Sequence, residues 1–173
     1  MLETGFADEA YSRYAVGATC ATTKLATFKA IVKKYPHMSR ETILRDLVAS
    51  QPGNEGKWFA AAKDAGFFEL AIELANRSPS APRTLIRAAK DYAVERQDFA
   101  LAAGMTALRG IVNGWGYDIT GADVLNAYDA IIAAAGAAGM DEAAAKADVR
   151  AIIAANRGGG EFAGRMLSSQ LAT

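Results

Sequence analysis

The stretch KWFAAAKDAGFFELAIELANRSP, from Lys57 to Pro79, decides the fold of this chain. From Phe67 onward its apolar residues recur with the i, i+3, i+4, i+7 spacing of a helix, through Leu70 to Leu74. This spacing predicts an amphipathic helix with one buried stripe. The alanine-rich residues before Gly66 predict another helix, because alanine is the best helix former. Gly66 between them predicts a helix stop, so the segment is interpreted as a helical hairpin.

The same helical spacing continues on both sides of this hairpin. Alternating runs of β-branched and aromatic residues, which would predict strands, are missing. The four prolines fall between the periodic segments, where a proline is tolerated. We therefore predict helices over residues 7–18, 23–34, 40–50, 56–65, 67–77, 83–94, 97–112, 121–138 and 141–156.

Several residues at the ends of these segments favour helix boundaries. Ser39 is a suitable N-cap for a helix that begins at the next residue. Pro82 suits the first turn of a helix. Thr120 followed by Asp123 indicates a variant capping box. Gly139, like Gly66, is expected to end a helix in the left-handed conformation.

The predicted helices favour an all-α fold, in which about nine helices form antiparallel hairpins stacked as a compact right-handed bundle or a short α-solenoid. With 173 residues in the chain, we expect a single domain over 1–156. The tail over 157–173 begins with three consecutive glycines, a composition typical of flexible linkers. It either forms a short final helix over 162–171 or frays.

An internal repeat is indicated by Ala61-Ala62-Lys63-Asp64, which recurs as Ala88-Ala89-Lys90-Asp91. Over residues 57–94 the alanine helix, glycine turn and second alanine helix resemble the helix–turn–helix core of tetratricopeptide-like repeats. The second helix stops early at Pro79, and the two copies lie closer together than the ~34 residues of that repeat. The resemblance is therefore to a related α-hairpin rather than to a regular array, and it implies a concave helical face for a protein or peptide partner.

A second resemblance covers most of the chain. YAVGATCATTKLATFKAIVKKYP (14–36), GKWFAAAKDAGFFELAIELA (56–75) and NGWGYDITGADVLNAY (113–128) resemble an uncharacterised bacterial all-helical family. This resemblance implies no known activity and assigns no role to any residue.

Composition limits the classes of partner and compartment. The 19 basic and 19 acidic side chains give a net charge of zero, which argues against a strongly basic nucleic-acid footprint. The single cysteine, Cys20, cannot form an internal disulfide, and a cytoplasmic location is expected. No apolar run approaches the ~20 residues of a membrane-spanning helix. The stretch MLETGFADEAYSRY lacks the pattern of a signal peptide.

Candidate chemical groups are few. His37 is the only histidine, and with Cys20 it supplies at most two ligands, whereas a zinc site needs about four. His37 is interpreted as a residue of a surface loop and Cys20 as a small residue at a helix junction, although Cys20 activated by His37 is the functional alternative. Glu69 and Glu73 are interpreted as part of a solvated face. We expect no catalytic residue, no metal site and no cofactor.

The most unusual loop is Asn113 to Asp118, which carries Trp115 and Tyr117 between glycines. These aromatics either form an exposed recognition surface or fold back over the end of the core. Together with basic side chains of the predicted helix over 83–94, they make the candidate binding surface: Trp115, Tyr117, Arg83, Arg87 and Lys90.

These features predict a non-enzymatic helical-repeat protein that acts as an adaptor for a protein or peptide partner. A competing hypothesis is nucleic-acid binding by the basic cluster Lys24, Lys29, Lys33, Lys34, Arg40 and Arg45, whose affinity would depend on salt. An enzyme with a non-obvious site is a further hypothesis. The same sequence is also compatible with a homodimer that forms through alanine-rich helix faces.

Overall fold

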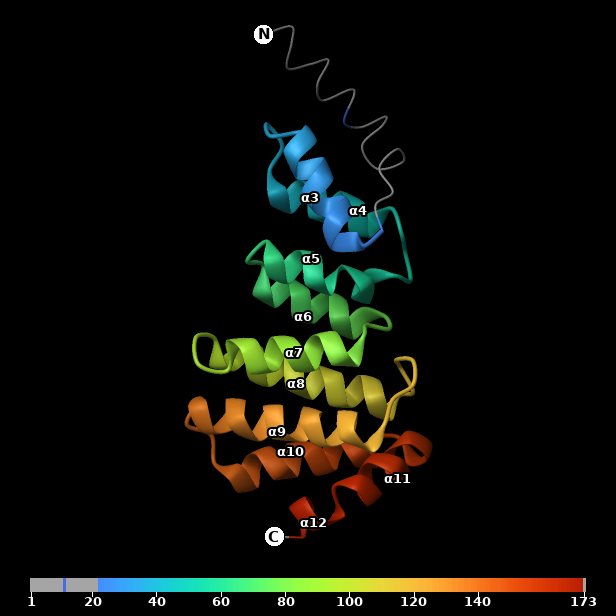
Figure 1. Cartoon of the computed structure of the whole chain (residues 1–173), viewed down its shortest axis with the longest axis vertical. Helices are drawn as coiled ribbons and strands as arrows, with labels where there is room; N and C mark the ends of the chain where they lie inside the picture. The colour runs from blue at the N-terminus through green and yellow to red at the C-terminus, as the bar shows by residue number, and fades with distance from the viewer. Residues whose placement is uncertain (1–10, 12–21, 173) are drawn as a thin grey trace, which may run out of the picture. The chain divides into compact units, whose positions relative to one another are not determined.

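The protein is all-helical, as predicted (Figure 1). The computed structural model describes Tyr11 and residues 22–172, and those residues contain no β-strand. Contacts between residues divide the chain into two compact units, which we name unit 1 (Met1–Ser78) and unit 2 (Pro79–Thr173). The expectation of one domain over 1–156 stays a prediction, and each unit is described by itself.

Unit 1 is built from short helices. Its described elements are α3 (Lys24–Lys34), α4 (Arg40–Ala49), the 3₁₀-helix η2 (Glu55–Trp58), α5 (Phe59–Asp64) and α6 (Phe68–Arg77). Helix α3 packs on both α4 and α5, and α5 pairs with α6. The chain reverses between α5 and α6 at Gly66, whose φ of 86° confirms the predicted left-handed helix stop. The predicted helix over 56–65 consists of the 3₁₀-helix η2 followed by the short α-helix α5.

The core of unit 1 explains why these helices form where they do. Ser39 caps α4 as predicted, since its hydroxyl accepts a hydrogen bond from the Thr42 N–H at 3.0 Å. Trp58 and Phe59 are buried, whereas Phe67 and Phe68 are only half-buried. Burial of one large apolar side chain contributes about 1.5–3 kcal/mol. The fully buried large side chains of unit 1 are Phe28, Ile31, Ile43, Leu44, Leu47, Trp58 and Leu74.

Tyr11 also belongs to this core. Its ring packs edge-on against Tyr35 at 5.3 Å between centroids, and its hydroxyl donates to Asp46 Oδ2 at 2.7 Å. Burial, reinforced by the neighbouring Asp46 carboxylate, raises the pKa of the Tyr11 hydroxyl well above its usual range. The rest of the predicted helix 7–18 lies outside the described residues.

Unit 2 contains the longer helices. Its elements are α7 (Pro82–Tyr92), α8 (Gln97–Val112), α9 (Gly121–Ala137), α10 (Glu142–Ala154), α11 (Arg157–Met166) and α12 (Ser168–Leu171). Helices α7 to α10 lie side by side, and consecutive ones run in opposite directions (Figure 1). Helix α9 packs on both α7 and α8. Pro82 is the first residue of α7, and Gly139 ends the turn after α9 with φ 72°, both as predicted.

Small residues bring α8 and α9 together. A Cβ added to Gly104 would lie 2.9 Å from Ile131 Cγ1, so glycine is needed where the two helices meet. Ala103 and Ala107 on α8 and Ala127 on α9 are fully buried. These positions explain the alanine content of the sequence, because close packing of helices excludes longer side chains.

The glycine-rich segment differs from the expectation. Gly158, Gly159 and Gly160 lie inside α11 rather than in a flexible linker, and the Asn156 side chain caps this helix by accepting from the Gly159 N–H. A Cβ on Gly159 would lie 2.0 Å from the Val112 carbonyl oxygen, and one on Gly160 would lie 2.1 Å from the Ile153 carbonyl oxygen. The glycines therefore let α11 approach the backbone of α8 and α10. Linker composition was the wrong interpretation, because glycine also serves close helix packing.

None of the helices in residues 22–172 combines the length and hydrophobicity that a bilayer crossing requires.

Candidate functional site

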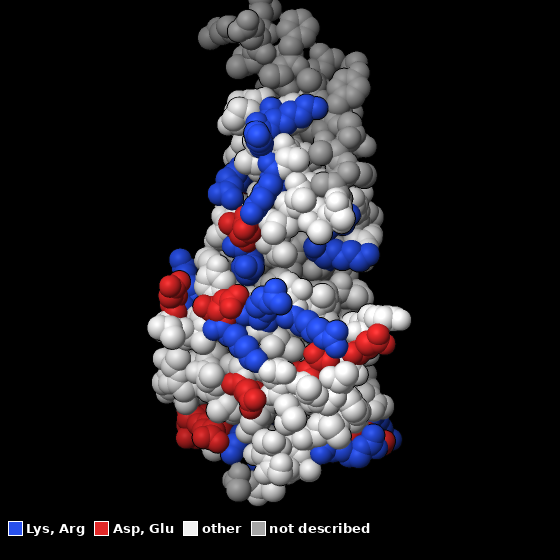
Figure 2. All heavy atoms as spheres, in the orientation of Figure 1, with Lys and Arg blue, Asp and Glu red and all other residues white. Residues whose placement is uncertain are grey.

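Three basic side chains form one stripe on α7. Arg83, Arg87 and Lys90 follow one another at i, i+4 and i+7, and all three are exposed. We name them the α7 basic stripe. Figure 2 shows Lys and Arg side chains gathered over this helix. The three basic residues of the predicted surface therefore share one exposed face of α7.

The Arg83 side chain is bound to helix α9. Its Nε and Nη2 donate to the two carboxylate oxygens of Asp123 at 2.8 and 2.9 Å, and Nη2 also donates to the Asp118 carbonyl oxygen at 2.8 Å. The Asp123 side chain is 13% exposed. The Arg83 guanidinium holds the pKa of the Asp123 carboxyl well below its usual range, against the opposing effect of burial. Asp123 in turn raises the pKa of Arg83.

Asp123 also confirms the predicted capping box. Its Oδ2 accepts hydrogen bonds from the backbone N–H of Thr120 at 2.8 Å and from the Thr120 hydroxyl at 3.0 Å. One carboxylate thus starts α9 and binds α7 through Arg83, and the bond from Arg83 to the Asp118 carbonyl fixes the end of the 113–118 loop. Arg83 is therefore a positioning residue first and a partner-binding residue only with its remaining exposed surface.

The other two members of the stripe differ from each other. The Lys90 ammonium donates to Asn126 Oδ1 on α9. Arg87 makes no hydrogen bond or ion pair within the residues that the structure describes. The guanidinium of Arg87 is thus available to a partner at the centre of the stripe.

The two aromatic side chains of the 113–118 loop lie in different environments, so each of the two alternatives left open by the sequence applies to one of them. Trp115 is half-buried, its backbone N–H donates to the Gly110 carbonyl oxygen at 2.8 Å, and its ring packs on Gly110. Tyr117 is 86% exposed. One aromatic therefore covers the end of the core, and the other points into solvent.

The backbone of the 113–118 loop has an unusual conformation. Gly114, Gly116 and Asp118 all have positive φ, and for Asp118 the value is 49°, which is uncommon for a residue with a side chain. A Cβ on Gly116 would lie 2.9 Å from Pro82 Cδ, so the loop packs directly on the first turn of α7. Tyr117 consequently lies in a loop that packs on α7 and is joined to Arg83 of the α7 basic stripe through the Asp118 carbonyl.

A second candidate surface lies in unit 1. A cleft of about 220 Å³ separates one face of α4 from one face of α6. We name it the α4–α6 cleft. Its lining residues are Arg45, Val48, Ala49, Pro52, Glu55, Leu70, Glu73, Leu74 and Arg77.

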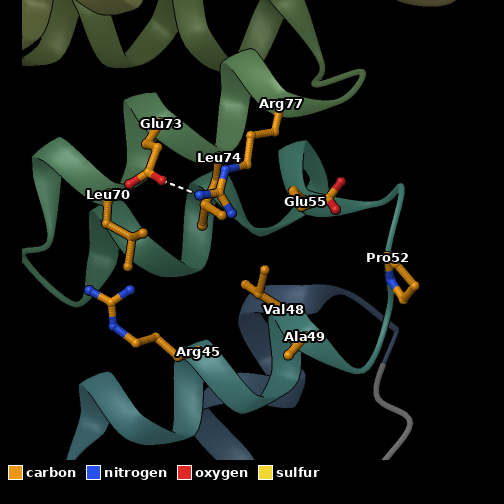
Figure 3. Close-up of a pocket in the computed structure, with 9 residues that line it drawn as sticks. All are labelled: Arg45, Val48, Ala49, Pro52, Glu55, Leu70, Glu73, Leu74 and Arg77. Carbon is orange, nitrogen blue, oxygen red and sulfur yellow. Dashed lines mark hydrogen bonds and ion pairs between the residues drawn. The ribbon is translucent and has the colours of Figure 1, made fainter.

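Figure 3 shows how the charged groups lie around this cleft. The Arg45 side chain reaches from α4 towards Leu70 on α6, and the Arg77 guanidinium lies beside the Glu73 carboxylate. Arg45 donates to the Glu41 carboxylate one turn earlier on its own helix. Both ion pairs are of the exposed i,i+4 type, which contributes only about 0.3–0.5 kcal/mol.

Glu55 marks the opposite end of the cleft from Arg45. The backbone N–H of Gly53 donates to Glu55 Oε1 at 3.0 Å and is the main cause of the lowered pKa of this carboxyl. The charged side chains around the cleft balance one another, two arginines against two glutamates, and Val48, Leu70 and Leu74 form its apolar floor.

The basic cluster considered for nucleic acid has local partners. Lys24 donates to the Gln51 side chain and lies 5.1 Å from the ring centroid of Trp58. Lys29 pairs with Asp64 at 3.1 Å. Arg45 is occupied by its ion pair on α4. Of the six basic side chains of this cluster, Lys29 and Arg45 have an acidic partner within unit 1.

The remaining members of that cluster are Lys33, Lys34 and Arg40. All three are exposed. The Lys34 ammonium lies 5.5 Å from the Tyr35 ring centroid, and the Arg40 guanidinium lies 5.9 Å from that of Phe28. These stacked positions are typical of long basic side chains that cover apolar surface.

The structure describes only one of the two candidate chemical groups. His37 is exposed, as expected for a loop residue, and its ring contacts that of Tyr35. Cys20 lies outside the described residues. Across the part of the chain that is described, no three His, Cys, Asp or Glu side chains gather as metal ligands would.

The sequence predictions missed the α4–α6 cleft. Glu73 was interpreted as part of a solvated face, and it is exposed, but it also lines the cleft. Leu70 was placed in the buried stripe, whereas it is half-buried and forms part of the cleft floor. The sequence carried no signal for this cleft, because the cleft depends on which faces of α4 and α6 lie opposite each other.

Comparisons with protein-family models, with curated proteins and with solved structures found no match for this chain. The resemblance of residues 57–94 to tetratricopeptide-like hairpins stays a prediction.

Proposed function

We propose that this protein is a non-enzymatic helical-repeat protein that binds a protein or peptide partner through unit 2. The proposed surface consists of the α7 basic stripe and the 113–118 loop. The observation that carries the proposal is the 86% exposure of Tyr117 on a loop held against α7. Rigid, exposed tyrosines and arginines are the residue types that dominate binding energy in protein interfaces.

Charge indicates the chemistry of the partner. Within the α7 basic stripe Arg83 is paired with Asp123, whereas Arg87 at the centre has no ionic partner in the described structure. An acidic segment complements this stripe, and an apolar residue within that segment would pack on Tyr117. Electrostatic complementarity of this kind sets specificity and the rate of association.

The proposal includes the compartment expected from the sequence. A chain with one cysteine suits a reducing cytoplasm, where disulfides are rare. The tetratricopeptide-like resemblance supports the same class of function, because helical repeats commonly bind extended partners on a concave face.

The test uses defined peptides and the full chain. Immobilised protein is used to select binders from a random-peptide display library, and we expect acidic sequences that contain an apolar residue to be enriched. The affinity of a selected synthetic peptide is then measured for wild type, Arg87→Glu, Tyr117→Ala and the control Arg165→Glu, which reverses an exposed arginine on α11. Arg87→Glu is expected to weaken binding about tenfold or more, as reversal of one interfacial charge does.

Two outcomes would contradict the proposal. One is enrichment of sequences without acidic residues. The other is equal affinity of Arg87→Glu, Tyr117→Ala and wild type for the selected peptide.

A further inference from the structure

Basic side chains outnumber acidic ones on α3 and α4. Residues 24–49 contain six basic and two acidic side chains, and neither of the acidic ones belongs to α3. Both acidic groups have partners, since Glu41 pairs with Arg45 and Asp46 accepts a hydrogen bond from the Tyr11 hydroxyl. Figure 2 shows Lys and Arg side chains over this part of unit 1. The surface of these two helices is therefore predominantly positive.

Three of these cations lie on either side of the turn between the two helices. Lys33 and Lys34 end α3, Arg40 begins α4, and all three residues are exposed. None of the three has an acidic partner among the described residues, whereas Lys29 on the same helix pairs with Asp64. We name Lys33, Lys34 and Arg40 the α3–α4 basic surface. Long basic side chains that pack on apolar surface keep their charged ends in water, so these charges are accessible to an anion.

The neutral charge of the whole chain does not cancel this local excess. At physiological salt the Debye length is about 8 Å, so exposed charges that are further apart than this are largely screened from each other. An anion at the α3–α4 basic surface therefore interacts mainly with the charges of these two helices, and only weakly with the sum over all 173 residues.

The side chains beside these cations restrict the class of ligand. Among the described residues, large apolar side chains are exposed only at Val94, Tyr117 and Met166, all in unit 2. A helix that binds a membrane surface needs an apolar face, and proteins bind single-stranded nucleic acid through aromatic side chains that stack on bases. Helix α3 instead exposes Ala26 and Ala30 beside its lysines. A polyanion that requires only phosphate contacts fits this surface better than either of those ligands.

The small extent of the α3–α4 basic surface favours DNA among the duplexes. Proteins that bind double-stranded RNA span about 16 base pairs and contact 2′-hydroxyl groups in two successive minor grooves. The three cations lie around a single turn between two short helices, so they can reach one short stretch of phosphate backbone.

We infer that the α3–α4 basic surface binds the phosphate backbone of double-stranded DNA without reading its sequence. Phosphate contacts supply essentially all of the affinity in non-specific binding, because each cation that neutralises a phosphate releases condensed counterions. The surface lies in unit 1 and shares no residue with the α7 basic stripe or the 113–118 loop. DNA binding here and peptide binding by unit 2 are therefore tested independently of each other.

The experiment measures the fluorescence anisotropy of a labelled DNA duplex of about 20 base pairs and mixed sequence with the full chain at increasing salt. Three phosphate contacts predict that the logarithm of the association constant falls with the logarithm of the salt concentration with a slope of about −2.7. The affinity is then expected to decrease about 40-fold between ~50 and ~200 mM salt. A second duplex of unrelated sequence is expected to give the same affinity, since phosphates carry no sequence information.

Variants without the charge test the individual residues. Lys33→Gln and Arg40→Gln are each expected to reduce the slope to about −1.8, because one phosphate contact is lost. The matched control Arg165→Gln removes an exposed arginine on α11 in unit 2 and is expected to keep the wild-type slope. Circular dichroism checks that each variant keeps its helical content, so that a change of slope reports on the contact alone.

Any one of the following results would overturn the inference. The DNA duplex does not bind at ~20 mM salt, where phosphate contacts are strongest. Lys33→Gln keeps the wild-type slope, or Arg165→Gln lowers the slope as much as Lys33→Gln does. Single-stranded DNA or an RNA duplex binds more tightly than the DNA duplex, which would indicate recognition of bases or of 2′-hydroxyl groups. Vesicles that contain anionic lipid bind more tightly than the DNA duplex, which would make the surface a membrane contact.

Discussion

Arg83 and Asp123 illustrate the difference between local and distant signals at the scale of single residues. Thr120 and Asp123 are three positions apart, so their capping box is predictable from the sequence. Arg83 lies 40 positions from Asp123, and only the packing of α7 against α9 brings the two together. The sequence placed Arg83 in a binding surface, whereas the structure uses it first to join two helices.

The depressed pKa of Asp123 predicts a specific pH dependence of stability. A carboxyl whose folded pKa lies below the unfolded value of about 3.9 stabilises the fold fully above that value, and the contribution is lost as the pH falls towards the folded pKa. We expect Asp123→Asn to lower the free energy of unfolding by about 1 kcal/mol at neutral pH. Below pH of about 4 the difference from wild type should shrink.

Urea unfolding between neutral pH and pH of about 2.5 checks this expectation. The control is Asp129→Asn, which replaces an exposed carboxylate on the same helix and should change stability by less than about 0.5 kcal/mol. A constant difference between Asp123→Asn and wild type over the whole range would show that the charge of Asp123 does not contribute.

At the scale of an element, helix α11 forms where the local sequence does not predict a helix. Three consecutive glycines are poor helix formers, so local preference alone predicts a linker. The element forms because Asn156 caps it and because its glycines pack on the backbones of α8 and α10. Tertiary contact thus overrides a local preference that is unfavourable by roughly 1 kcal/mol per glycine.

Two neighbouring glycines of α11 are expected to respond in opposite ways to replacement by alanine. Gly159→Ala is expected to destabilise the protein by about 1–3 kcal/mol despite the better helix propensity of alanine, because its Cβ would overlap the Val112 carbonyl. Gly158→Ala is the control. The nearest atom to its added Cβ is Asn156 Oδ1 at 3.9 Å, so it should stabilise by up to about 1 kcal/mol. Thermal unfolding followed by circular dichroism distinguishes the two, and equal effects would contradict the packing argument.

At the scale of the whole molecule, each unit has its own core and its own tryptophan. Trp58 is fully buried in unit 1, and Trp115 is half-buried in unit 2. We expect the two compact units to unfold in separate steps, because cooperative units of a protein can open at different free energies. This differs from the single-domain prediction and can be measured.

The measurement uses Trp115→Phe, in which fluorescence reports on unit 1 alone. Adding Gly159→Ala to this background is expected to lower the urea midpoint seen by circular dichroism for unit 2, while the Trp58 fluorescence midpoint stays constant. A parallel shift of both midpoints would mean that the chain unfolds as one cooperative domain, as the sequence predicted.

The sequence by itself determined the helical class and most helix boundaries, including the N-cap at Ser39 and the turn at Gly66. These features depend on periodicity, caps and glycine conformations within a few residues. The tertiary structure alone decided which side of the 113–118 loop is buried, which charges Arg83 and Arg45 face, and where α4 and α6 leave a cleft. Those outcomes depend on which helix faces meet, and distant contacts leave no local pattern in the chain.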